Sequence, residues 1–194
     1  MLTQLISLCK GRLENFGNYN FFENIQILSP TKKGMLGTKE LNKRLQEELN
    51  PSEDNKNEKK IGDIIFREGD RVMQVKNNYD IYWEKGSNYN LNYETGTGIF
   101  NGEIGKIVKI DFINKQIKIL FDDEKEAWYA FSDMDQIEHA YAITVHKAQG
   151  SEFDVVIVVV TQSSAMLLTR NLLYTGLTRA KKLLILIGND NVVK

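Results

Sequence analysis

The sequence predicts an α/β protein in which a domain built on a parallel sheet is interrupted by a small β-barrel. Two apolar runs, Val155 to Val160 and Leu183 to Ile187, are typical of strands buried on both faces of a parallel sheet. Leucines recur every fourth residue from Leu41 to Leu49, which predicts a helix with one apolar face. Between these parts, from about Gly62 to Ile137, alternating runs and closely spaced glycines indicate short antiparallel strands.

The composition is that of a globular protein. Hydrophobic residues make up 42% and charged residues 26% of the 194 residues, and the formal net charge is −1. These values exclude a disordered, collagen-like or coiled-coil chain. The single cysteine, Cys9, excludes an internal disulfide, and with only two histidines a structural zinc site is not expected. No apolar run approaches the ~20 residues of a membrane span and no secretory signal is visible, so we expect a cytoplasmic protein with no membrane partner.

The elements of the first part follow from local signals. Ile25 to Leu28 is a short apolar run closed by Ser29 and Pro30, which predicts a strand followed by a loop. Thr38 occupies the N-cap position of the leucine-patterned helix, and Pro51 ends it.

The middle and last parts are assigned in the same way. Two alternating runs, 103–112 and 115–121, predict a hairpin that turns at Asn114. Residues 85–98 are rich in Asn, Tyr and Gly, which indicates a long loop. A short strand at 141–143 precedes the two buried strands, and a helix is predicted between those strands at about 164–182.

Three polar blocks stand next to these strands, where open parallel sheets bind ligands. In the first, residues 29–34, Lys32 and Lys33 beside Gly34 could bind phosphate or form a solvated turn. The second, residues 144–153, brings hydroxyl, imidazole, amide and carboxylate groups into one connection. In the third, residues 174–182, Arg179 could complement the helix dipole or bind a phosphate. No block by itself decides between its alternatives.

The order and spacing of the blocks resemble the C-terminal motor half of superfamily 1 DNA helicases, in particular the RecD-like branch, which includes the alpha subunit of exodeoxyribonuclease V. The resemblance covers roughly residues 25–190. Residues 27–42 resemble helicase motif IV, 142–153 motif V, and 173–180 motif VI. The strings at 69–74, 77–80 and 100–105 resemble the SH3-like insertion of that branch.

The resemblance implies a role for ten residues. Arg179 matches the arginine finger, which neutralises charge on the transferred phosphoryl group. Lysine at position 33 keeps a positive charge where relatives often have arginine but lacks bidentate geometry. The implied nucleotide contacts are Lys33, Gln149, Gly150 and Glu152, and the implied DNA contacts are Thr144, His146, Asn77, Asn78 and Asn101.

The resemblance also implies an organisation and a set of partners. Residues 1–24 would be a linker helix, 25–61 and 138–194 the second RecA-like motor domain, and 62–137 an SH3-like β-barrel. The sequence has no G-x-x-x-x-G-K-[ST] phosphate loop, so an N-terminal motor domain of the same protein would supply it, together with the magnesium site. The complete protein would use ATP and Mg2+ to move 5′ to 3′ on single-stranded DNA, with or without the other exodeoxyribonuclease V subunits, and these residues alone would be inactive.

A second hypothesis is a non-enzymatic module that binds nucleic acid or protein through its barrel, with the α/β part as scaffold. The near-neutral charge and the missing phosphate loop favour it.

Overall fold

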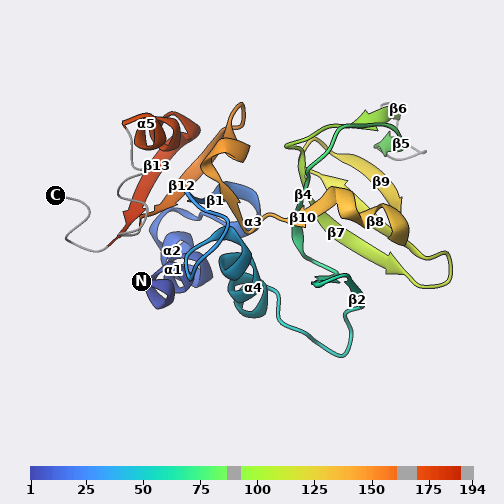
Figure 1. Ribbon diagram of the computed structural model, residues 1–194, viewed down its shortest axis with the longest axis horizontal. Helices are drawn as coiled ribbons and strands as arrows, with labels where there is room; N and C mark the ends of the chain where they lie inside the picture. Colours follow the sequence, from blue (N-terminus) through green and yellow to red (C-terminus); the bar gives the residue numbers. More distant parts are fainter. Residues whose placement is uncertain (87–92, 161–169, 189–194) are drawn as a thin grey trace. The chain divides into compact units, whose positions relative to one another are not determined.

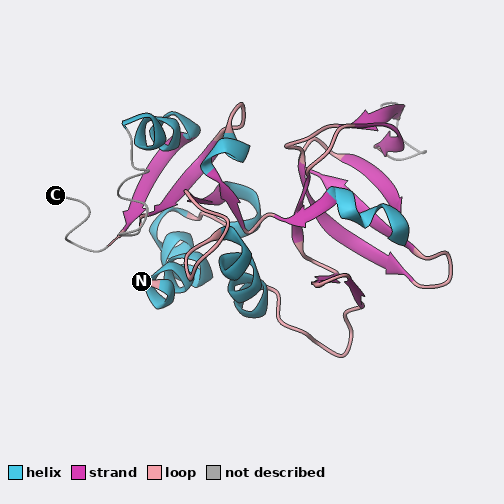
Figure 2. Cartoon of the chain, viewed as in Figure 1, coloured by secondary structure: helices cyan, strands magenta, loops and turns pink. Residues whose placement is uncertain are grey.

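The computed structural model describes residues 1–86, 93–160 and 170–188. The chain forms two compact units (Figures 1 and 2). Met1–Leu49 together with Tyr141–Lys194 form the first, here called the α/β unit, and Asn50–Ala140 form the second, here called the β unit. No helix in the described ranges has the length and apolar character needed to cross a membrane.

A four-stranded parallel sheet forms the centre of the α/β unit. Its strands are β1 (Ile25–Ser29), β11 (Ala142–Thr144), β12 (Phe153–Val159) and β13 (Ala180–Ile187), in the order β11-β1-β12-β13. Every neighbouring pair is parallel. The buried apolar runs of the sequence are therefore strands of one parallel sheet, as predicted.

Helices cover both faces of this sheet (Figure 1). On one face, Ile25 and Ile27 of β1 share an apolar core with Leu5, Leu41 and residues of the N-terminal helices. On the other face, α5 packs closely on β12 because Gly176 has no side chain. A Cβ at this position would lie only 2.9 Å from Val158 Cγ2. The helices are α1 (Leu2–Ser7), the π-helix η1 (Leu8–Arg12), α2 (Leu13–Gly17), α3 (Phe21–Asn24), α4 (Thr38–Leu49), the 3-10 helix η3 (Val145–Ala148) and α5 (Arg170–Arg179).

Antiparallel strands make up the β unit. Seven of them form one sheet in the order β10-β4-β7-β8-β9-β5-β6, and β2 and β3 form a separate hairpin. The elements are β2 (Glu58–Ile61), β3 (Ile64–Arg67), β4 (Arg71–Gln74), β5 (Asn78–Lys85), β6 (Glu94–Ile99), β7 (Ile104–Asp111), β8 (Gln116–Phe121), β9 (Lys125–Ala130), the 3-10 helix η2 (Phe131–Gln136) and β10 (Ile137–His139).

The β unit has its own apolar core, which includes Ile107, Ile117, Phe121 and Tyr129. Strands β7 and β8 form the hairpin predicted from the sequence. They approach closely at Gly105, where a Cβ would lie 2.6 Å from the carbonyl oxygen of Leu120. A separate core in each unit explains why the chain divides into two compact parts.

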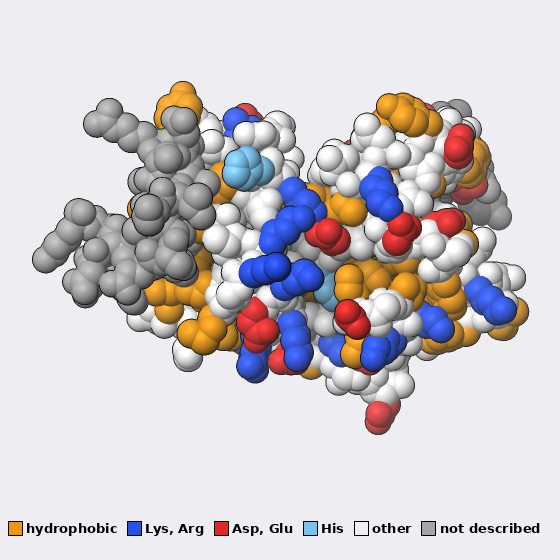
Figure 3. All heavy atoms as spheres, viewed as in Figure 1, with side chains coloured by type: hydrophobic (Ala, Val, Ile, Leu, Met, Phe, Trp, Pro, Cys, Tyr) orange, Lys and Arg blue, Asp and Glu red, His pale blue; other side chains and the backbone are white. Residues whose placement is uncertain are grey.

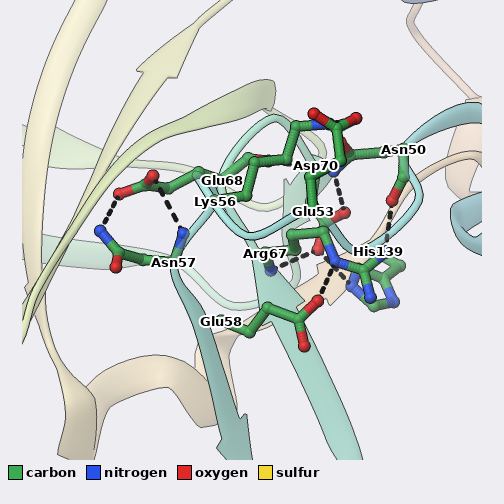
Figure 4. Close-up of polar contacts among 9 residues, drawn as sticks. All are labelled: Asn50, Glu53, Lys56, Asn57, Glu58, Arg67, Glu68, Asp70 and His139. Carbon is green, nitrogen blue, oxygen red and sulfur yellow. Dashed lines mark hydrogen bonds and ion pairs between the residues drawn. The ribbon is translucent and has the colours of Figure 1, made fainter.

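A buried polar network lies where the chain enters and leaves the β unit (Figure 4). The Asp70 carboxylate is fully buried and accepts hydrogen bonds from Asn50 Nδ2 at 2.8 Å and from the Arg67 backbone N–H at 2.7 Å. His139 Nε2 lies 3.1 Å from the same carboxylate. Arg67 also binds Glu58 and the Asn50 carbonyl. The network connects the first residue of the unit with one of its last.

The structural boundaries of the insertion differ from those expected from the sequence. The compact units meet at 49/50 and 140/141, whereas the sequence analysis placed the insertion at 62–137. The difference has a physical cause, because Asn50 belongs to the Asp70 network and β2 pairs with β3.

Two further elements differ from their predicted extents. The ends of the predicted loop 85–98 belong to the strand pair β5 and β6, and 87–92 lie outside the described residues. The helix predicted to end at residue 182 ends at Arg179 because Ala180 already pairs with Phe153 in the sheet. Its first predicted residues, 164–169, lie outside the described part of the chain.

Candidate nucleotide and DNA contacts

Two consecutive turns form the connection from β11 to β12. The Thr144 hydroxyl caps the helix η3, accepting a hydrogen bond from the Lys147 N–H at 3.4 Å. A four-residue turn follows, in which the Ser151 N–H donates to the Ala148 carbonyl at 3.2 Å. Gln149 has φ −63° and ψ 130°, and Gly150 has φ 87°. These values are those of a type II turn, which requires a positive φ at its third residue and therefore favours glycine there.

Arg179 lies beside this turn. It is the last residue of α5 and directly precedes β13, and the pairing of Phe153 with Ala180 brings it next to the start of β12. Its Nη1 donates a hydrogen bond to the Ser151 carbonyl at 3.2 Å, and its Nε is buried without a hydrogen-bond partner in the described part of the chain. The side chain as a whole is only half-buried. A guanidinium can bind phosphate oxygens through two parallel hydrogen bonds, so Arg179 is a candidate contact for an anion.

Glu152 follows the turn and is exposed. Its carboxylate lies 3.5 Å from Lys181 Nζ, and the two side chains are 59% and 53% exposed. Because an ion pair exposed to this degree contributes little stability, the carboxylate can exchange that partner for another. The structure therefore brings Arg179, Ser151 and Glu152 together at the amino-terminal edge of β12 and β13.

Lys33 lies in a different place. It is exposed in the loop between β1 and α4, which is held in shape by hydrogen bonds from Ser29 Oγ to the Leu36 carbonyl at 2.7 Å and from the Thr38 N–H to the Thr31 carbonyl at 3.0 Å. This loop follows the carboxyl end of β1, whereas Arg179 precedes the amino end of β13. In a parallel sheet those two positions are at opposite edges. The structure does not bring the two cations side by side.

The predicted DNA contacts of the α/β unit lie near the loop that holds Lys33. Thr144, opposite Ser29 in the register, is only 8% exposed, and its hydroxyl is engaged as the cap of η3. His146 lies on η3 and is exposed, as is Gln149 after it. Several basic side chains gather on the face of the α/β unit seen in Figure 3. The exposed lysines of the Lys33 loop and of α4 are Lys32, Lys33, Lys39 and Lys43.

The predicted DNA contacts of the β unit form a small group of their own. Asn77 Oδ1 accepts a hydrogen bond from the Asn101 N–H at 2.9 Å, and Asn78 Nδ2 donates to Gln136 Oε1 at 2.8 Å. Asn77 Oδ1 and one N–H of Asn78 Nδ2 are therefore engaged within the protein.

Two aromatic residues beside these asparagines are not among the contacts predicted from the sequence. Tyr79 and Phe100 are 66% and 42% exposed, and their ring centroids lie 5.5 Å apart in an edge-to-face arrangement. Each lies next to a predicted asparagine contact, Asn78 or Asn101, which is the signal that could have drawn attention to them. Exposed aromatic rings can stack on unpaired bases.

A parallel α/β domain with an arginine beside the first residues of its last strand, interrupted by an antiparallel β module, is the architecture of the second motor domain of a superfamily 1 helicase. Residues 139–187 match the UvrD-like helicase C-terminal domain, and residues 41–121 match the ATP-dependent RecD-like DNA helicase SH3 domain. Both regions are thus similar to domains of RecD-like helicases, which confirms the family resemblance and the fold class expected from the sequence.

Relatives of this family are known from several organisms. An ATP-dependent RecD2 DNA helicase of Deinococcus radiodurans is 34% identical over 157 residues, which are 81% of this chain and 19% of that protein. A RecBCD enzyme subunit RecD of Buchnera aphidicola subsp. Schizaphis graminum is 29% identical over 172 residues, 88% of this chain and 26% of that protein. An uncharacterized protein of Methanocaldococcus jannaschii is 32% identical over 197 residues, 95% of this chain and 16% of that protein. The chain thus spans between 16% and 26% of the length of these three relatives.

A solved structure shares the fold. The crystal structure of Pif1 helicase from Bacteroides in complex with ADP-AlF3 and ssDNA aligns with a TM-score of 0.52 at 18% identity, covering 96% of this chain and 44% of that one.

Proposed function

We propose that this chain is the C-terminal half of an ATP-dependent DNA helicase that moves 5′ to 3′. In this role Arg179 reaches a nucleotide held by an N-terminal motor domain and neutralises charge on the transferred phosphoryl group, an effect of roughly a thousandfold or more in rate. The observation that carries the proposal is the position of Arg179: the residue is half-buried, and its guanidinium is bound to the connection of motif V next to the exposed Gln149 and Glu152. During turnover, the nucleotide site between the two motor domains would close and open, and this motion would move DNA that both domains hold.

The nucleotide contacts are assigned to Arg179, Gln149, Gly150 and Glu152, with Lys33 as a separate contact. The exposure of Gln149 and Glu152 and their position beside Arg179 support the first group. Lys33 rests on the resemblance of motif IV and on its exposure. Of the described residues, no group of three or more His, Cys, Asp or Glu could hold a metal ion. Following the resemblance, we assign Mg2+ and the phosphate loop to the N-terminal motor domain.

The DNA contacts are assigned to Thr144 and His146 in the α/β unit and to Asn77, Asn78 and Asn101 in the β unit. The exposed imidazole of His146 and the exposed lysines nearby support binding to a phosphate backbone. For Thr144, whose hydroxyl caps η3, the contact would position the backbone of the turn against DNA.

The partners follow from the family. Single-stranded DNA and the N-terminal motor domain of the same protein are required by the proposed cycle. Because one relative is named as a subunit of the RecBCD enzyme, the other subunits of exodeoxyribonuclease V are a further candidate partner. A DNA motor of this kind would work in the cytoplasm.

The purified 194 residues are expected to hydrolyse no ATP, with or without single-stranded DNA, because the phosphoryl group is held elsewhere. If these residues do hydrolyse ATP and Arg179→Ala abolishes that hydrolysis, the proposal is overturned.

In the complete protein, His146→Ala should weaken the binding of a labelled oligonucleotide several-fold in fluorescence anisotropy, whereas Asn55→Ala, at an exposed position outside the site, should not. Equal affinities for all three proteins would remove His146 from the DNA contacts.

A further inference from the structure

The turn Ala148–Ser151 and the guanidinium of Arg179 are connected by the hydrogen bond from Arg179 Nη1 to the Ser151 carbonyl. We propose that this turn positions Arg179, and that Gly150 is a positioning residue for ATP hydrolysis that acts through the Ser151 carbonyl. The inference rests on the proposed function, in which Arg179 is the arginine finger. It adds a reason for glycine at position 150 besides contact with a nucleotide.

The backbone at Gly150 determines where the Ser151 carbonyl points. Its φ of 87° lies in the left-handed region, which residues with a Cβ rarely adopt. Nothing lies within 4 Å of the place a Cβ would take, so a side chain there would be opposed by backbone conformation and not by a clash. An alanine at this position relaxes toward negative φ and turns the Ser151 peptide away from Arg179.

The guanidinium depends on that carbonyl. Nη1 donates to the Ser151 carbonyl, and Nε has no hydrogen-bond partner among the residues that the structure describes. The base of the side chain is fixed independently, because α5 packs on β12 at Gly176. The turn therefore determines the orientation of the guanidinium, and the packing of α5 determines the position of the Arg179 backbone.

The same turn carries residues assigned to the nucleotide. Gln149 and Gly150 belong to it and Glu152 follows it, and the Lys181 partner of Glu152 is held weakly enough to be exchanged. A nucleotide that binds these residues would therefore affect the position of the Ser151 peptide, whose carbonyl binds Arg179. The turn thereby couples occupancy of the site to the placement of the finger.

The first test measures the contact itself, in the 194-residue chain and without nucleotide. Side-chain 15N–1H spectra resolve the two Nη groups of an arginine when a hydrogen bond hinders rotation of its guanidinium, and Arg179→Lys identifies the signal among the six arginines. We expect resolved Nη signals for the unmodified chain and for Ser151→Ala, which keeps the carbonyl, and averaged signals for Gly150→Ala. Averaged signals in the unmodified chain, or resolved signals in Gly150→Ala, would overturn the inference.

The second test measures turnover in the complete protein. Gly150→Ala should lower kcat on the order of tenfold to a hundredfold, since a displacement of about 1 Å costs that much. Gly150→Asn should lose less, because asparagine tolerates a positive φ. Gly62→Ala likewise replaces a glycine of positive φ, 58°, in the β2–β3 turn and should leave kcat unchanged. A raised KM with an unchanged kcat, or equal losses in all three variants, would contradict the inference.

The two tests separate this inference from the proposed function. If Arg179→Ala leaves turnover unchanged, the proposed function fails, while the spectra still decide whether the turn holds Arg179. If Arg179→Ala abolishes turnover and Gly150→Ala alters neither the spectra nor kcat, the proposed function stands and the positioning role of Gly150 is refuted.

Discussion

Replacing Asp70 by alanine should destabilise the β unit strongly. The carboxylate is fully buried, and its polar partners at 2.7–3.1 Å include Asn50 Nδ2, the Arg67 N–H and His139 Nε2. Each buried donor left without an acceptor costs about 1–3 kcal/mol. Because some of the network can relax toward water, we expect a total of about 3–5 kcal/mol, the range found when one partner of a buried charged network is removed.

The sequence offers a direct assay for this change. Trp83 and Trp128 are the two tryptophans of the chain and both lie in the β unit, so tryptophan fluorescence during urea unfolding reports on that unit. Asp63→Ala, which removes an exposed carboxylate in the turn between β2 and β3, is the matched control and should change the free energy of unfolding by at most about 0.5 kcal/mol. A loss of less than about 1 kcal/mol for Asp70→Ala would refute the view that this network holds the insertion together.

Three further predictions concern single positions. Burial raises the pKa of the Cys9 thiol to about 12, so a disulfide reagent at pH 8 should label it only after unfolding; rapid labelling of the native chain would contradict this. Gly105→Ala should cost about 1–3 kcal/mol by the tryptophan assay, because the new methyl group meets the Leu120 carbonyl; an unchanged unfolding midpoint would show that the strands can separate freely. Hydrogen bonds from Asn114 lower the pKa of Asp111 from its ordinary value of 3.8 in the folded protein. The stability that these bonds contribute is therefore complete at a pH above the pKa of Asp111 in the unfolded chain, and it is lost as the pH falls through the lower pKa of the folded protein. Asn114→Ala keeps the bond from the backbone N–H and removes the bond from the side-chain amide, so it should raise the pKa of Asp111 part of the way in carboxyl 13C titrations. An equal pKa in both proteins would argue against a contribution from the Asn114 side chain.

The sequence predicted the parts of the fold that depend on local patterns. The buried strands, the helix that starts at Thr38 and the hairpin of the β unit follow from periodicity and caps, which act within a few residues. The boundaries of the insertion depend instead on Asp70, which binds Asn50 and His139, and nothing in the local sequence of either partner announces that contact.

The candidate site shows the same division. The motifs identified Arg179, Glu152 and Lys33 as candidates, but they did not show that the Ser151 carbonyl holds Arg179, because that bond joins residues 28 apart in the chain. One part could have been deduced. Arg179 precedes a strand and Lys33 follows one, and in a parallel sheet these positions belong to opposite edges.

The rate of ATP hydrolysis by the complete protein with Arg179→Ala tests the central claim most directly. With saturating ATP and single-stranded DNA, the account predicts a loss of roughly a thousandfold in turnover, since the phosphoryl charge is no longer neutralised. The affinity for the oligonucleotide should stay within about twofold, because Arg179 lies beside the nucleotide contacts and is not assigned to DNA. Turnover equal to that of the unmodified protein would contradict the account.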